Sequence, residues 1–314
     1  MKRVLKNLCL STAIAMAPMV FGHTAVADDE ISLKTTELSS GIFMIEGVGG
    51  FTGGNILLSV GADGVVMIDD GLPPFLGLLQ QSVQKLTDKK VDYLINTHIH
   101  GDHTGNNASY GAGHTHIVAH ENMRLQMATT GVPGGTGPAP KAALPVITFS
   151  DKMAFHLNGA NAQLLHVAHA HTNGDTVVHF AKENIIHTGD VLFNGMFPYI
   201  DLDSGGSATG YLAAQKKIYS LANAKTKIIP GHGPLASKAD LKASIDMLED
   251  SIARVNKWVK KGLSEDDIVA KNPLKKYHDK WNWGFITTEK MTRTLYKDIT
   301  GTKPKNEYKG GHEH

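Results

Sequence analysis

Four side chains that commonly bind metal ions lie within six consecutive positions of the sequence. His98, His100, Asp102 and His103 follow a short apolar run that ends at Asn96. Imidazole nitrogens and carboxylate oxygens are frequent ligands of zinc and other divalent metals. A hydrogen-bonded core histidine explains one such residue, but not three histidines and an aspartate in a single turn. We expect His98 and His100 to face one cation while Asp102 and His103 turn toward a second.

Three later residues each add a potential ligand after a short apolar run. They are His171, Asp190 and His232, and each is preceded by a predicted strand. Because open α/β layers place their sites at the carboxyl ends of strands, we expect the three to meet the first cluster at one edge. The sequence therefore offers seven candidate metal ligands.

The elements that must position these residues are strands interleaved with helices. Short apolar runs separated by glycine-rich turns predict strands, and longer amphipathic stretches predict helices. The predicted strands are residues 42–46, 55–60, 65–69, 91–96, 115–119, 153–157, 162–167, 176–180, 184–187 and 227–229. The predicted helices are residues 73–86, 121–128, 208–221 and 238–260. Two halves of similar order predict an α/β domain with two layered sheets.

The composition is that of a globular chain with almost no net charge. Its 314 residues include 31 Lys and Arg against 30 Asp and Glu, and 41% are hydrophobic. This balance excludes a strongly basic nucleic-acid-binding protein, and the apolar content excludes a disordered chain. Cys9 is the one cysteine, so neither an internal disulfide nor a cysteine-rich zinc module is possible.

Residues 1–27 have the features of a secretory signal peptide. A basic head precedes an apolar run over residues 8–21, and small residues end at Ala27. The run is shorter than the roughly 20 residues that span a bilayer, which disfavours a membrane anchor. We expect cleavage after Ala27, leaving residues 28–314 as a single domain with C-terminal helices in the periplasm or the secreted fraction.

The order and spacing of the ligand segments resemble the metallo-β-lactamase superfamily. The resemblance covers residues 42–235 and implies the four-layer αββα sandwich of that superfamily, with the site at one edge between the two sheets. The matching motifs are His-x-His-x-Asp-His at 98–103, His-Thr-x-Gly-Asp at 171–175, Gly-Asp at 189–190 and Gly-His at 231–232.

Carried over position by position, the resemblance implies two Zn²⁺ ions per chain. Asp190 stands where dinuclear hydrolases such as glyoxalase II and the lactonases have a carboxylate that bridges both ions. Cysteine-dependent zinc β-lactamases have a cysteine at that position. The implied ligands are His98, His100 and His171 for one ion and Asp102, His103 and His232 for the other.

The activity that the resemblance implies is hydrolysis of a small molecule. A metal-bridging hydroxide, oriented by Asp102, would attack the carbonyl of an ester, lactone or thioester. A zinc β-lactamase is the alternative. A mononuclear iron oxygen-dependent enzyme and a noncatalytic metal-binding protein are further alternatives, which the complete ligand set disfavours. The motifs of the nucleic-acid-processing branches are not found, so we expect neither a nucleic-acid partner nor membrane association after signal cleavage.

Four side chains are candidates for contacts with the substrate. Phe51 lies in a glycine-rich hairpin tip, Phe193 and Tyr199 follow the Gly-Asp segment, and His169 precedes a predicted ligand by two residues. On an extended chain, His169 would point to the same side as that ligand. In cysteine-containing zinc β-lactamases a lysine at the position of Phe193 pairs with the carboxylate of the drug. We therefore expect uncharged carbonyl compounds to be better substrates than β-lactams.

Cleavage of the signal peptide can be tested at the amino terminus of the mature protein. Mass spectrometry of the native protein should find Asp28 as its first residue, because the basic head, apolar run and Ala-x-Ala site direct cleavage after Ala27. Retention of Met1 on a soluble cytoplasmic population would contradict the prediction.

Overall fold

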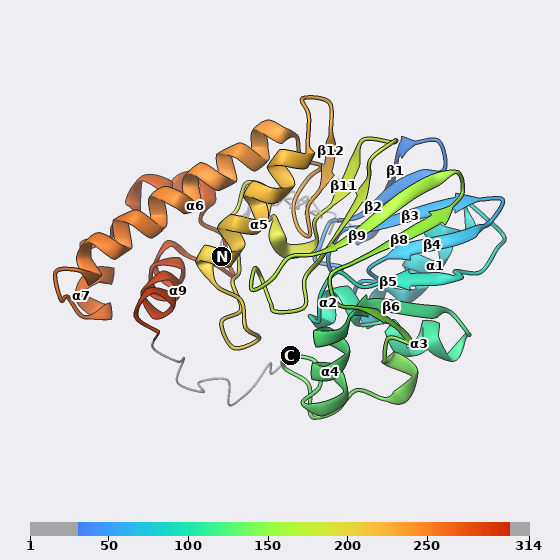
Figure 1. Ribbon diagram of the computed structural model, residues 1–314, viewed down its shortest axis with the longest axis horizontal. Helices are drawn as coiled ribbons and strands as arrows, with labels where there is room; N and C mark the ends of the chain where they lie inside the picture. The colour runs from blue at the N-terminus through green and yellow to red at the C-terminus, as the bar shows by residue number, and fades with distance from the viewer. Residues whose placement is uncertain (1–30, 302–314) are drawn as a thin grey trace, which may run out of the picture. The chain divides into compact units, whose positions relative to one another are not determined.

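The computed structural model describes residues 31–301 and contains two β-sheets (Figure 1). The predicted signal peptide and its cleavage site lie outside the described residues. The first sheet has the order β1 (Ser32–Ser39), β2 (Ile42–Val48), β3 (Ile56–Gly61), β4 (Gly64–Ile68), β5 (Tyr93–Ile95), β6 (His116–His120) and β7 (Ile147–Phe149). The second has the order β12 (Lys227–Ile229), β11 (Ile185–His187), β10 (Thr176–Phe180), β9 (Ala160–His166) and β8 (Lys152–Leu157).

The direction of the strands brings several connecting loops together at one edge of each sheet. Strands β1 to β4 are antiparallel, whereas β4 to β7 are parallel to one another. In the second sheet β11 and β12 are parallel and the other neighbours are antiparallel. Parallel strands end at the same edge, so the loops after β4 and β5 in one sheet, and after β11 and β12 in the other, each emerge together.

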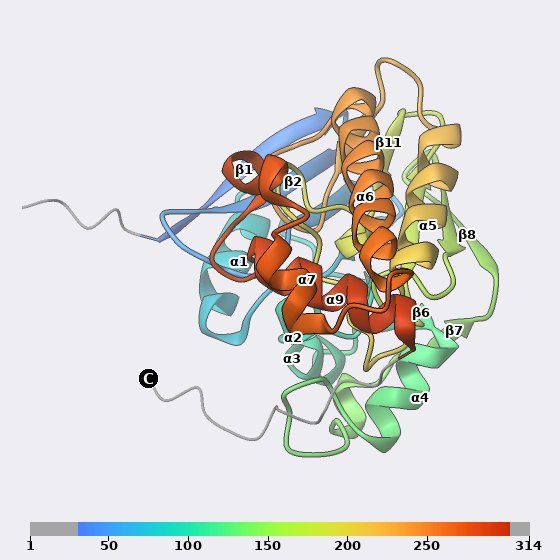
Figure 2. The same ribbon diagram turned by 90° about the vertical axis from the view of Figure 1, so that its left-hand side faces the viewer.

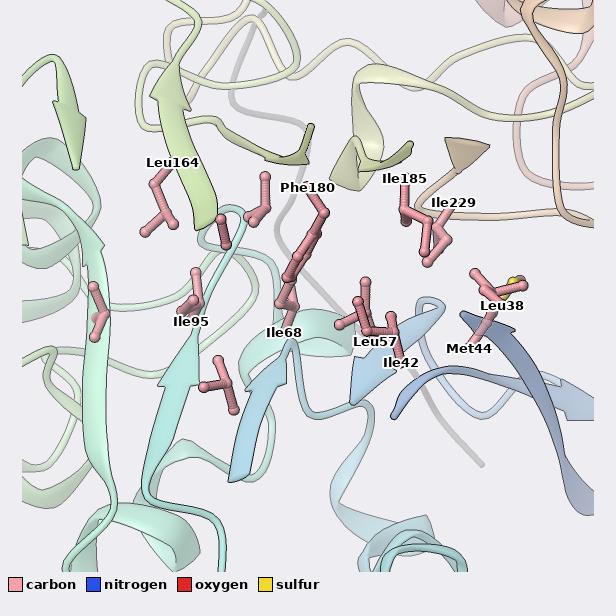
Figure 3. Close-up of a cluster of buried hydrophobic side chains, with 14 of the residues drawn as sticks. Leu38, Ile42, Met44, Leu57, Ile68, Ile95, Leu164, Phe180, Ile185 and Ile229 are labelled. Atoms are coloured by element: carbon pink, nitrogen blue, oxygen red, sulfur yellow. The ribbon is translucent and has the colours of Figure 1, made fainter. Parts of the chain in front are cut away.

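Side chains on successive strand positions enter different cores because they point to opposite faces of a sheet. In β4, Val66 and Ile68 belong to the core between the sheets, whereas Val65 and Met67 belong to the core outside the first sheet. Figure 3 shows the inner core, in which side chains from the two sheets face each other. The labelled residues are Leu38, Ile42, Met44, Leu57, Ile68 and Ile95 from the first sheet or its edge, and Leu164, Phe180, Ile185 and Ile229 from the second.

Helices cover the outer face of each sheet. Helix α1 (Leu76–Gln84) packs with Leu79 and Val83 against the first sheet. Helices α5 (Ala208–Leu221) and α6 (Lys238–Val259) cover the second sheet, where Ile218 and Ile245 pack against its strands (Figures 1 and 2). The predicted αββα sandwich is therefore confirmed.

The remaining helices are shorter or C-terminal. Helices α7 (Glu265–Lys271) and α9 (Thr288–Thr300) pack with α6 around Trp281 and Leu295, which are buried. No helix within residues 31–301 is long and apolar enough to cross a lipid bilayer. These helices are α2 (Gly101–Thr104), α3 (Asn107–Ala112), α4 (Glu121–Thr129), α7 (Glu265–Lys271), α8 (His278–Trp281) and α9 (Thr288–Thr300).

Candidate metal centre

The seven predicted ligands meet where the strand ends of the two sheets come together. The motif at 98–103 follows β5 and enters α2, and the other three ligands follow β9, β11 and β12. Their donor atoms form two groups, and within each group all the atoms lie within 4.8 Å of one another. The first group is His98, His100, His171 and Asp190, and the second is Asp102, His103 and His232.

The carboxylate of Asp190 lies between the two groups. Its Oδ2 is 3.6 Å from Nε2 of His98 and 3.4 Å from Nε2 of His171. Its Oδ1 is 3.1 Å from Nε2 of His103 and 3.4 Å from Nε2 of His232. One carboxylate thus presents one oxygen to each group.

In two histidines of the first group, the ring nitrogen that faces away from the other donors carries the proton. Nε2 of His100 lies 2.9 Å from Oδ2 of Asp201, and Nδ1 of His171 lies 2.8 Å from the carbonyl oxygen of Tyr199. Because both acceptors require a donated proton, the lone pairs are left on Nδ1 of His100 and Nε2 of His171. These two nitrogens are 2.8 Å apart and have no proton to share, so a cation held by both would satisfy them.

Buried Asp69 fixes two further rings. Its carboxylate accepts hydrogen bonds from the backbone nitrogen and the hydroxyl of Thr97 and from Nδ1 of His103, each at 2.8 Å. The same Thr97 hydroxyl lies 3.0 Å from Nδ1 of His98, from which it accepts because its own proton goes to Asp69. These bonds leave Nε2 of both histidines facing Asp190.

Divalent cations would satisfy the donor atoms better than the donors satisfy one another. Nε2 of His98 is buried and has no hydrogen-bond partner within residues 31–301, and buried Oδ1 of Asp190 faces only the ring nitrogens of His103 and His232. A buried polar atom without a partner costs free energy, and a bound cation would remove this cost.

The loop after β12 approaches Asp190 so closely that only glycine is accommodated at position 231. A Cβ at Gly231 would lie 1.9 Å from Oδ1 of Asp190.

The pKa values describe neutral rings at His98 and His171 and protonated rings at His103 and His232, beside ionised carboxylates. Burial lowers the pKa of His98 well below its usual range and that of His171 to about 4. Burial opposes ionisation of Asp102, but the charges of His103 and His232 still bring its pKa down to about 2. The pKa of His232 rises to about 9, because attraction to Asp190 and Asp102 outweighs its burial. The centre therefore favours positive charge at the position of the second group.

Three of the four predicted substrate contacts lie against candidate ligands. The rings of Phe193 and Phe51 stack on His232, with centroids 5.0 Å and 5.6 Å away. The ring of Tyr199 lies 5.5 Å from that of His100. Both rings belong to one apolar surface. Phe51 is 59% exposed and forms its free part, whereas Phe193 is buried and forms its fixed part.

His169 does not join this surface. Its φ of 50° turns the chain, so the extended backbone that we expected before His171 is not found. The side chain is exposed, and its Nδ1 lies 2.9 Å from the carbonyl oxygen of Gly205. The hydroxyl of Thr172 instead bonds within its own turn: it donates to Asp175 and accepts from the backbone nitrogen of Gly174, and within residues 31–301 it contacts no candidate ligand.

A model of the metallo-β-lactamase superfamily matches residues 49–232, which include all seven candidate ligands. The chain belongs to the metallo-β-lactamase superfamily. Members of this superfamily are metal-dependent hydrolases. The predicted family membership is thereby confirmed, and so is the general class of enzyme.

Three named proteins match the chain at low sequence identity, one by sequence and two by structure. The chain is 24% identical over 67% of its length to 2,4-dinitroanisole O-demethylase subunit alpha of Nocardioides sp., and covers 61% of that protein. A metallo-β-lactamase from Pontibacter korlensis matches with a TM-score of 0.58 and 18% identity, over 70% of this chain and 100% of that one. A sec-alkylsulfatase from Pseudomonas sp. matches with a TM-score of 0.63 and 15% identity, over 86% of this chain and 50% of that one.

The contact between Asp201 and His100 leads to a prediction about metal affinity. Asp201→Asn keeps the shape but weakens the acceptor that orients the ring, so zinc affinity should fall about 10- to 100-fold. Competition with a chelator measures this change. Asp203→Asn is the matched control, because Asp203 is exposed and contacts no candidate ligand. Equal affinity in the two variants would show that Asp201 has no orienting role.

Proposed function

We propose that the protein is an exported, dinuclear zinc-dependent hydrolase that attacks the carbonyl carbon of an ester, lactone or thioester and cleaves its acyl C–O or C–S bond. The observation that carries the proposal is the position of Asp190, which offers one oxygen to each of two donor groups. The signal-like residues 1–27 support export. The absence of cysteine after residue 9 supports an all-His and carboxylate donor set, which suits zinc.

The chemistry of the proposal needs no serine or cysteine nucleophile. Two zinc ions would supply a hydroxide near neutral pH and polarise the substrate carbonyl. Of the seven donors, the most exposed side chain is that of Asp102 at 20%, followed by His232 at 12% and His100 at 11%. A substrate therefore approaches from the side of these three residues, where Asp102 is placed to accept a proton and orient the attacking water.

The surroundings of the donors favour an apolar substrate near the reacting bond. Phe51, Phe193 and Tyr199 surround the exposed side of the centre. Apolar walls of this kind exclude water and hold the uncharged part of a ligand. No cation stands at position 193 to bind a carboxylate next to the reacting carbonyl.

The named relatives act on different bonds. Their names specify an O-demethylase of an aryl ether, a β-lactamase and an alkylsulfatase. The chain covers 61% of the first and half of the last, and such fold-level likeness does not select a substrate. A zinc β-lactamase remains the alternative, and an alkyl sulfate and an aryl methyl ether belong in the same assay panel.

The metal content tests the first part of the proposal. The purified protein should contain two zinc ions per chain by elemental analysis, because the donors exceed what one tetrahedral ion uses. Asp190→Ala should lower both the zinc content and the turnover, since it removes the group shared by both donor sets. Lys242→Ala, which alters an exposed residue of α6, should change neither. One iron ion and no zinc per chain would refute the proposal.

The choice of substrate tests the second part. With the zinc-loaded protein, kcat/KM for an uncharged aryl ester or lactone should exceed that for penicillins and carbapenems by at least about tenfold. The reason is the missing charge-assisted bond at Phe193, which is commonly worth about 1.5 to 3 kcal/mol. A β-lactam that is hydrolysed as fast as the best ester would favour the alternative, and turnover of the alkyl sulfate alone would exclude both.

A further inference from the structure

Four aromatic side chains form a continuous wall from the metal centre outward, which we call the aromatic wall. Its members are Phe193, Trp283, Phe285 and Tyr199. The ring centroids are 5.9 Å apart between Phe193 and Trp283, 5.6 Å between Trp283 and Phe285, and 5.3 Å between Phe285 and Tyr199. Both ends of the wall contact candidate ligands, because Phe193 stacks on His232 and Tyr199 lies beside the first donor group.

The wall joins two parts of the chain that are far apart in sequence. Nε1 of Trp283 donates a hydrogen bond of 2.9 Å to the carbonyl oxygen of Phe197, and the backbone nitrogen of Phe197 donates one of 2.7 Å to the carbonyl oxygen of Trp281. Phe197 is fully buried. The segment before α9 is therefore held against the loop that follows Asp190, and its rings have a defined position beside the centre.

Lys290 places a cation on the outer part of this wall. Its Nζ lies 3.9 Å from the ring centroid of Phe285 and 5.8 Å from that of Tyr199. Partial burial lowers the pKa of its ammonium group. No ion pair within residues 31–301 involves Lys290, since the adjacent acid, Glu289, binds Arg293 instead.

The location of Lys290 is electrostatically unfavourable for the protein alone. It occupies the first turn of α9, where the N-cap Thr287 accepts a hydrogen bond from the backbone nitrogen of Lys290. The positive end of a helix repels a cation, and partial removal from water adds to the cost. Contact with two rings offsets only part of this cost. An anion at this point would be attracted by both the ammonium group and the helix end.

We propose that Lys290 binds a carboxylate on the substrate, at a position remote from the bond that is cleaved. The inference rests on the proposed hydrolase function and narrows its substrate class to carbonyl compounds with a distant anionic group. Such a ligand would lie with its apolar part along the aromatic wall and its reacting carbonyl at the donors. A β-lactam does not fit this description, because its carboxylate is two bonds from the reacting nitrogen and would lie near Phe193 rather than near Lys290.

A pair of esters that differ in one terminal group tests the proposal. Mono-para-nitrophenyl glutarate carries a carboxylate at the far end of its acyl chain, and para-nitrophenyl valerate has a methyl group there. In the zinc-loaded protein, Lys290→Met should lower kcat/KM for the glutarate ester about tenfold or more, mainly through KM. The valerate ester should change less than about threefold. Lys290→Arg should retain most of the activity toward the glutarate ester.

Lys297→Met is the matched control, because Lys297 lies about two turns further along the same helix and contacts no ring of the wall. It should leave both esters unaffected. The preference of the wild type for the glutarate ester should also shrink as ionic strength rises. Equal losses for both esters in Lys290→Met would assign the residue a structural role and overturn the proposal, as would the absence of any loss.

The test separates this proposal from the one on which it rests. Hydrolysis of the valerate ester without an effect of Lys290 refutes the carboxylate site and leaves the hydrolase function intact. If neither ester is cleaved, the hydrolase function fails, and calorimetric titration of the glutarate ester decides the role of Lys290. Weaker binding to Lys290→Met than to wild type then supports the carboxylate site, and equal binding refutes it.

Discussion

The burial of a carboxylate among imidazoles is the constraint on which the arrangement of this protein depends. Asp190 is 4% exposed, and an ionised group at such a site is costly unless cations or donors surround it. The backbone around it is fixed by Tyr211, whose hydroxyl donates to its carbonyl oxygen at 2.8 Å, and by Gly231, whose nitrogen donates to Gly189 at 2.7 Å. The carboxylate thus holds its place between the two donor groups.

The two sheets meet this constraint from opposite sides. The first sheet contributes Asp69 at the end of β4, which orients Thr97 and His103 after β5. The second contributes Asp190 and His232 after its parallel strands β11 and β12. Each donor segment begins at the end of a strand that is held in a sheet with a buried core, so the donors are positioned by the strands that they follow. A metal site with this geometry requires both sheets, so the fold and the centre depend on each other.

The sequence predicted those features of the fold and the site that depend on residues close together in the chain. The ligand motif, the strands that precede each ligand and helices such as α5 follow from residues close together in the chain. Strand β1 was not predicted, because it is largely exposed and polar, and β7 has only three residues. Asp69 gave one local signal, an aspartate that ends an apolar strand, but its bonds to Thr97 and His103 bridge 28 and 34 positions. Contacts of that separation are set by the topology of the sheet.

The same distinction divides the part of the centre inside the family match from the part that lies after it in the chain. The candidate ligands all lie within residues 49–232, the region that matches the superfamily. Trp283, Phe285 and Lys290 lie beyond it, in the C-terminal segment that docks on Phe197. Tryptophans in a C-terminal region of this kind are usually core residues, and Trp281 is buried in the core. The ring of Trp283 instead contacts Phe193 beside the centre. Under the proposal for Lys290, the donor set performs the hydrolysis while the C-terminal segment selects the substrate, so a change in that segment would alter specificity without altering the chemistry at the donors.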